Sequence, residues 1–178
     1  MAMIDGLLQE MEQEAHTTRR VLERVPSGQL AWKPHAKSMS LGQLALHVAT
    51  IPGNVAEIAM QSPFNLPPQL TQPSATSGAE LLPALEQSVA KAKQLLGAVD
   101  DATLSSPWRL MDGDRELMSM PRTAMLRMVM LNHWYHHRGQ LSVYLRQLDV
   151  PLPSIYGPSA DENPFAPVEP TERQAATI

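Results

Sequence analysis

Apolar residues recur every three or four positions along four stretches of this chain, which is the spacing of one face of an α-helix. The stretches cover residues 2–25, 40–62, 77–99 and 121–148. No stretch shows a convincing alternation of apolar and polar residues, which is the pattern of a half-buried strand. The pattern therefore predicts an all-α fold in which four amphipathic helices form a four-helix bundle.

Proline and capping residues mark the predicted helix boundaries. Ser40 with Gln43, and Ser77 with Glu80, have the spacing of a capping box, in which two side chains satisfy backbone N–H groups at a helix start. Pro52 lies inside the second helix and removes one backbone hydrogen bond there. Prolines cluster at 63–73 and 151–170, where we expect no helix.

The segments between the helices define the expected domain organisation. Residues 62–76 form a long exposed loop, which leaves room for a crossover connection between the second and third helices. Residues 100–120 are irregular, with short apolar pieces that could form a turn or a hairpin. We expect one bundle domain over 1–150 and a proline-rich segment over 151–178 that packs on the bundle and frays at its last residues.

Composition excludes several classes of protein. The 178 residues suit one domain, and 14 Lys and Arg against 18 Asp and Glu give a net charge of −4, which argues against nucleic-acid binding. No cysteine is present, so disulfides, thiolate metal sites and a cysteine nucleophile are excluded. The first residues lack the basic and apolar regions of a signal peptide, and no run is apolar enough to span a membrane. We expect a cytoplasmic protein.

Three histidines fall on predicted core faces. His133 and His137 occupy consecutive positions of the apolar stripe of the fourth helix, so their imidazoles stand one turn apart. His47 lies on the apolar side of the second helix. Three imidazoles with an open coordination position are the arrangement of a catalytic zinc site, and the same set also suits nickel, iron or manganese.

Other interpretations of these histidines must be kept. Each could be a hydrogen-bonded core residue with no ligand, and an H-x-x-x-H pair on a helix is not specific by itself. His136 points about 100° away from His137 and is a weaker ligand candidate. His16 and His35 are expected at the surface. Trp134 follows His133, so the H-E-x-x-H pattern of metallopeptidases is absent.

Two segments of the chain resemble a known family. AWKPHAKSMSLGQLALHVA at 31–49 and NHWYHHRGQLSVYLRQLDVPLPSIYGPSADE at 132–162 resemble the DinB-like (YfiT-like) family of bacterial damage-inducible proteins. That superfamily includes metal-dependent thiol transferases. The resemblance implies a metal triad at His47, His133 and His137, an up-down-down-up bundle, and frequent homodimers.

The residues near the triad have open roles at this stage. Arg138 and Gln140 could orient a ligand or hold an imidazole, although Arg138 could equally pair with an acid. Tyr144 and Tyr156 could supply a proton, or could be packed tyrosines with satisfied hydroxyls. Among acidic residues, Asp161 and Glu162 are the best candidates for a carboxylate that reaches back to the metal.

Three classes of function follow from this sequence. The first is a metal-dependent transferase that joins a thiol to small electrophiles; without a cysteine, the thiol must come from a small-molecule cosubstrate. A metal-dependent hydrolase is the alternative enzyme. The second class is a non-catalytic metal-binding or ligand-binding protein of the stress response. The third is a helical scaffold in which the histidines are merely packed.

Overall fold

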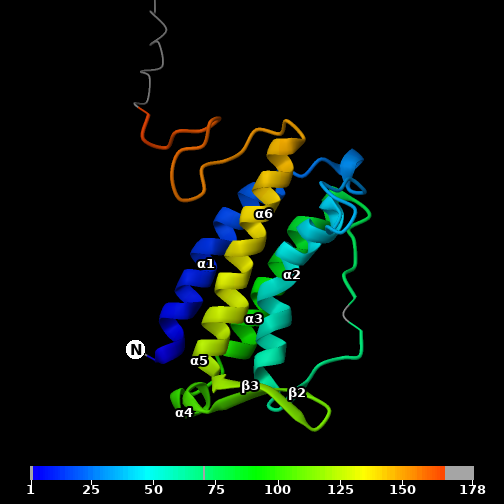
Figure 1. Ribbon diagram of the computed structural model, residues 1–178. Coiled ribbons are helices and arrows are strands. Elements are labelled where there is room, and N and C mark those ends of the chain that lie inside the picture. Colours follow the sequence, from blue (N-terminus) through cyan, green and yellow to red (C-terminus); the bar gives the residue numbers. More distant parts are fainter. Residues whose placement is uncertain (1, 70, 167–178) are drawn as a thin grey trace, which may run out of the picture.

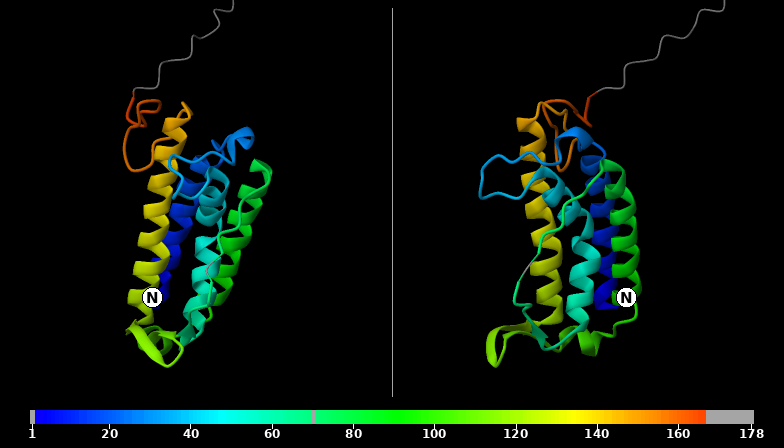
Figure 2. Two further views of the ribbon diagram at one scale, coloured as in Figure 1. Left: turned by 45° about the vertical axis from the view of Figure 1, so that its right-hand side comes forward. Right: turned by 90° about the vertical axis from the view of Figure 1, so that its right-hand side faces the viewer.

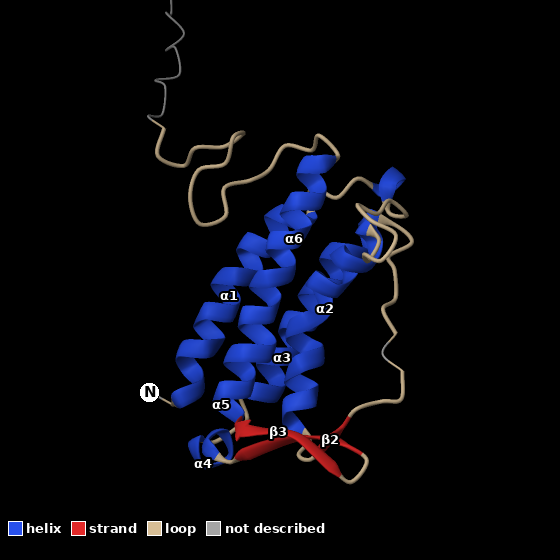
Figure 3. Cartoon of the chain, viewed as in Figure 1, coloured by secondary structure: helices blue, strands red, loops and turns tan. Residues whose placement is uncertain are grey.

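The computed structural model describes residues 2–69 and 71–166, and most of them lie in helices. Four helical regions pack side by side, and the strands lie at one end of them (Figures 1 and 3). The long helices are α1 Met3–Leu22, α2 Leu41–Met60, α3 Leu81–Leu96 and α6 His133–Gln147; α5 Arg122–Met125 and the π-helix η3 Leu126–Asn132 lead directly into α6.

The four long helices run in two opposite directions. Helices α2 and α3 both run toward the end that carries the strands, whereas α1 and α6 run away from it (Figures 1 and 2). The connection between α2 and α3 returns along the outside of the bundle beside α2 (Figure 2). Helix α2 packs against α3, α6 and α1, so it occupies a central place. Its residues Leu44, Val48 and Ile51 are buried in the shared apolar core.

The prediction of an all-α fold needs correction, because a small sheet closes one end of the bundle. Strands β2 Pro107–Asp112 and β3 Arg115–Pro121 pair antiparallel, and the two-residue strand β1 Phe64–Asn65 pairs parallel with β2. The hairpin falls within the irregular stretch 100–120, which also holds the short helix α4 Asp101–Ser105. The adjacent apolar pairs Leu110–Met111 and Leu117–Met118 break the alternation in these strands, and most of β3 is exposed.

One of the two predicted capping boxes is present. The Ser40 hydroxyl accepts the N–H of Gln43 at 3.2 Å, and the Gln43 side chain accepts the N–H of Ser40 at 2.9 Å. The second prediction is wrong. Ser77 instead accepts the N–H of Ala79 at the start of a short 3₁₀ helix, Gly78–Glu80, and α3 begins only after it.

Pro52 does not interrupt α2, because neighbouring helices satisfy the backbone groups it frees. Proline has no N–H, so the carbonyl of Val48 loses its usual helical donor. That carbonyl accepts the indole N–H of Trp134 on α6 at 2.8 Å. The N–H of Gly53 donates to the Ser88 hydroxyl on α3 at 2.8 Å, and a Cβ on Gly53 would lie 2.8 Å from the Ser88 backbone oxygen. Helix α2 is thus fixed to both neighbours just after His47.

No helix within residues 2–69 and 71–166 is both long enough and apolar enough to cross a membrane. Residues 151–166 run back over α1 and α6, where Arg20 pairs with Glu162 and Arg146 pairs with Asp161. The fraying expected for the last residues concerns 167–178, which lie outside the described residues.

Candidate metal centre

The structure brings His47, His133 and His137 together. His47 comes from α2, and the other two come from the first turns of α6. The Nε2 atoms of His47 and His133 are 3.1 Å apart, and one nitrogen of each of the three rings lies within 4.8 Å of the other two. Because a metal–imidazole bond is about 2.1 Å long, the three side chains could hold one ion between them.

The surroundings of the three imidazoles keep them neutral, which is the form that binds a metal. The pKa of His47 is lowered to about 4, chiefly by burial, with the charges of His137 and His133 acting in the same direction. Burial also lowers the pKa of His133, with His137 and His136 acting in the same sense. Burial lowers the pKa of His137 as well, whereas the hydrogen bond that His137 makes to Gln140 raises it.

That hydrogen bond fixes the orientation of one ring. Nδ1 of His137 lies 2.7 Å from Oε1 of Gln140. Since an amide oxygen only accepts, Nδ1 carries the proton and Nε2 is left with its lone pair. A partner of this kind is usual behind a metal-binding histidine.

The three histidines line one side of a pocket of about 460 Å³. Its other walls come from α2, from Met39 just before it, from Val129 of the π-helix and from the connection between α2 and α3; they are Met39, Thr50, Ile51, Asn54, Val55, Ile58, Val129, Thr71, Gln72 and Pro73. None of these residues is charged. A small molecule could therefore reach the imidazoles without meeting a fixed ion pair.

The histidines do not occupy the fully buried seam of the last helix, as their spacing predicted. Leu126 and Met130 of the predicted apolar stripe are buried, but beyond them the buried positions are Leu131, Trp134, Arg138, Leu141 and Leu145. The π-helix Leu126–Asn132 explains the change, because bonding to the fifth residue back fits an extra residue into the turn. His133 and His137 are consequently half-buried beside the seam and face the pocket.

A family model described as the DinB family matches residues 2–171 of the chain. The chain belongs to the DinB family. A protein of Bacillus subtilis (strain 168) described as uncharacterized protein YrdA is 27% identical over 163 residues, which cover 89% of this chain and 91% of that one.

Two solved structures of DinB-like proteins have the same fold. One from Bacillus cereus matches with a TM-score of 0.68 and 22% identity, over 86% of this chain and 97% of that chain. Another, YjoA from Bacillus subtilis, matches with a TM-score of 0.64 and 22% identity, over 85% and 97% of the two chains. At this identity the likeness concerns the fold alone.

Arg138 of this DinB protein points away from the histidines. Its side chain is buried and forms an ion pair with the Glu14 carboxylate of α1 at 2.6 Å. It also donates to the Thr18 hydroxyl at 3.1 Å and to the Tyr156 hydroxyl. Of the two roles considered for Arg138, the structure therefore places it in an ion pair that joins α1, α6 and the segment after α6.

The tail carboxylates do not reach the site, contrary to the expectation for Asp161 and Glu162. Asp161 pairs with Arg146, and Glu162 pairs with Arg20. Tyr156 donates to Glu14 at 2.9 Å, on the opposite side of α6 from the pocket. Tyr144 packs edge-on against Trp32, with ring centroids 5.5 Å apart, so it anchors the 31–39 loop. The partners of Tyr156, Asp161 and Glu162 were not predictable, because the path of residues 151–166 leaves no periodic signal.

Sequence reasoning missed two polar residues of the pocket, Thr50 and Asn54. They follow His47 by three and seven positions, which is the spacing of one helix face. That spacing was the available signal. Asn54 is exposed to the pocket, whereas the Thr50 hydroxyl donates to the Leu46 carbonyl at 2.9 Å.

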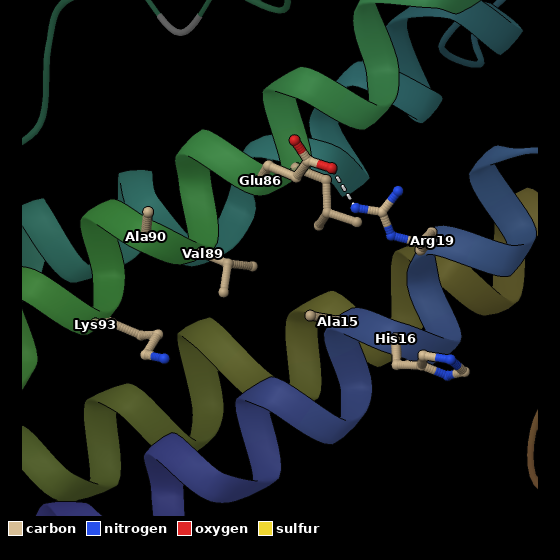
Figure 4. Close-up of a pocket in the computed structure, with 8 residues that line it drawn as sticks. Ala15, His16, Arg19, Glu86, Val89, Ala90 and Lys93 are labelled. Carbon is tan, nitrogen blue, oxygen red and sulfur yellow. Dashed lines mark hydrogen bonds and ion pairs between the residues drawn. The ribbon is translucent and has the colours of Figure 1, made fainter.

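The remaining histidines lie elsewhere. His16, His35 and His136 are exposed, as expected for the first two. His16 borders a separate hollow of about 410 Å³ between α1 and α3, where Arg19 pairs with Glu86 (Figure 4). Over the residues that the structure describes, the His47, His133 and His137 group alone brings three potential metal-binding side chains together.

Proposed function

We propose that this DinB protein binds a divalent metal ion through His47, His133 and His137 and catalyses transfer of a small-molecule thiol to an electrophile. The observation that carries the proposal is the convergence of three neutral imidazoles on an uncharged pocket of about 460 Å³. When bound, such an ion lowers the pKa of a thiol or a water molecule, so that either becomes a nucleophile near neutral pH.

The chain's own residues support this chemistry by binding and orientation. Gln140 holds the His137 ring with Nε2 toward the pocket, and the apolar wall residues Ile51, Val55 and Val129 limit water near the imidazoles. The chain has no cysteine, so the thiol is a cosubstrate. In the reaction a carbon–sulfur bond forms, the bond to the leaving group breaks, and the thiol proton passes to solvent.

A non-catalytic role in metal or ligand binding is the second candidate. It is favoured by one observation, which is that the pocket walls carry no Asp, Glu or Lys that could act as a general base. This role requires stoichiometric metal without turnover. A metal-dependent hydrolase would instead turn over an ester in the absence of any thiol.

The proposal also covers the identity of the metal, the compartment, the oligomeric state and the order of the helices. We propose zinc or nickel as the native metal, with iron or manganese as alternatives. We also propose a cytoplasmic homodimer that serves a stress response, with the four helical regions in up-down-down-up order.

The test combines metal analysis with a thiol assay. Protein purified without an affinity tag should contain about one metal ion per chain, and His47→Ala should lose it. The zinc-loaded or nickel-loaded protein should couple glutathione, bacillithiol or mycothiol to 1-chloro-2,4-dinitrobenzene at least about tenfold faster than His47→Ala does, since loss of even an outer partner costs 10–100-fold.

His136→Ala is the matched control, because it removes an exposed neighbouring imidazole that does not face the pocket. It should keep both metal and rate. Metal binding without any thiol-dependent rate would favour the non-catalytic role, and protein without stoichiometric metal would refute both.

A further inference from the structure

A second pocket, made entirely of apolar side chains, lies beside the candidate metal centre. Its volume is about 330 Å³, and its walls come from the end of α2, the small sheet, α5 and the π-helix; they are Ile58, Phe64, Leu66, Pro67, Trp108, Leu110, Met118, Met125 and Val129. The one polar group among these side chains, the indole N–H of Trp108, donates to the Ile58 carbonyl at 3.1 Å. The pocket therefore offers a ligand no hydrogen bond from a side chain.

This apolar pocket adjoins the pocket that the three histidines line. Ile58 and Val129 line both of them. Val129 and Met125 precede His133 by four and eight residues on the same continuous helical segment, so they lie about one and two turns before that histidine. A molecule of modest length that is held at the imidazoles could thus extend past Val129 into the apolar pocket.

Solvent still reaches this pocket in the described chain. Leu66 and Met118, on its rim, are 37% and 36% exposed. Exposed apolar surface gathered in a hollow is typical of a binding site, and the volume matches a small-molecule group rather than a flat protein interface.

We infer that the apolar pocket holds the alkyl or aryl part of the substrate while its polar end lies at the three histidines. This inference rests on the proposed metal site and deepens it, because it assigns the substrate to amphipathic small molecules. Burial of each further methylene in the pocket should raise affinity about fourfold until the pocket is filled.

The test uses hydroxamates, whose head group binds metals whatever the reaction may be. Acetohydroxamate, butanohydroxamate, hexanohydroxamate and octanohydroxamate are titrated into the cobalt-loaded protein, and visible absorption reports binding. Each step of the series adds two methylenes, so we expect affinity to rise about sixteenfold per step until the pocket is filled. Met118→Gln, which places an amide in the pocket at nearly constant volume, should remove most of this gain without weakening acetohydroxamate.

Leu117→Gln is the matched control. Leu117 is the neighbour of Met118 on β3, is 40% exposed and does not line the pocket. It should leave the whole series unchanged. A second readout uses zinc-loaded protein with ¹³C-labelled methionine methyl groups, in which octanohydroxamate, but not acetohydroxamate, should shift the Met118 and Met125 signals.

The outcomes separate the two proposals. If acetohydroxamate binds and longer chains gain nothing, this inference is overturned and the metal site stands. If the cobalt protein does not respond to acetohydroxamate, the proposed function fails and takes this inference with it. If Met118→Gln or chain length instead alters the oligomeric state, a second copy of the chain covers the pocket, and the inference is also overturned.

Discussion

His137 and Arg138 are adjacent in sequence, yet they belong to two polar clusters that differ in the kind of partner each residue meets. Arg138 lies among partners of complementary character, since the Glu14 carboxylate, the Thr18 hydroxyl and the Tyr156 hydroxyl surround its guanidinium. His137 lies among groups of its own kind, with His47 and His133 at ring-centroid distances of 4.7 and 4.4 Å.

The difference separates a structural cluster from a binding cluster. Burying a polar group is costly unless a partner satisfies it, and the Arg138 cluster meets that requirement within the chain. The three imidazoles face one another instead, and, in addition to burial, the charge of His137 lowers the pKa of both His47 and His133. Their proximity is best offset by a cation that all three can share.

The largest effect should come from breaking the Arg138 cluster. Arg138→Met leaves the partly buried Glu14 carboxylate without its cation, so the free energy of unfolding should fall by about 3 kcal/mol. Metal content per folded chain should not change, because Arg138 faces away from the pocket. Urea unfolding and elemental analysis measure the two quantities.

Arg146→Met is the control for that change. Arg146 also pairs with a carboxylate, that of Asp161, but both side chains are more exposed, so the loss of stability should be much smaller than for Arg138→Met. If Arg138→Met removed the metal from protein that stays folded, the two clusters would not be independent.

A smaller effect should follow from freeing the His137 ring. Gln140→Leu removes the acceptor of the Nδ1 proton, and metal affinity should fall about tenfold, as for other outer partners of histidine ligands. Gln140 is exposed, so the stability of the metal-free protein should stay unchanged. Competition with a chromogenic chelator measures the affinity, and Gln147→Leu on the exposed face of the same helix should have no effect.

The last effect concerns the pH dependence of stability in metal-free protein. Because the pKa of His47 is about 4 in the folded chain and near 6.5 when unfolded, the unfolded state takes up the proton first as pH falls. The free energy of unfolding should therefore decrease between about pH 6.5 and 4 and lose no more from this group below that range. Urea unfolding with a chelator present measures this.

His47→Gln should flatten that profile, whereas His16→Gln, at an exposed position, should leave it unchanged. An equally steep profile in His47→Gln would show that His47 does not set the pH dependence.

The sequence was sufficient for the parts of the site that depend on helical spacing. The stripes located the four long helices, and the spacing around His47 and His133 selected the three residues that converge. The sequence was insufficient where the structure depends on the backbone hydrogen-bonding pattern of a helix or on the route of a loop. Leu126–Asn132 has the composition of an α-helix, yet its bonding to the fifth residue back moves Trp134 and Arg138 into the seam.

Long-range pairings account for the other differences. The hairpin of β2 and β3 is local and lies in the stretch where a hairpin was considered, but the third strand, β1, joins it only because residues 64–65 meet β2 more than forty positions later. Asp161 and Glu162 find arginines on α6 and α1 rather than the histidines, and this depends on the route of the segment after α6. Neither event changes the local pattern of apolar residues, so neither could be anticipated from it.

The outer wall of the metal pocket comes from a different kind of element than the imidazoles do. Thr71, Gln72 and Pro73 belong to the connection between α2 and α3, whereas the three histidines stand on packed helices. Connections of this kind tolerate insertion and deletion far better than helices do. Lengthening or shortening this connection would widen or narrow the entrance of the pocket and leave the imidazole nitrogens in place. The size of the molecule that the pocket admits could therefore change in evolution while the helices stay the same.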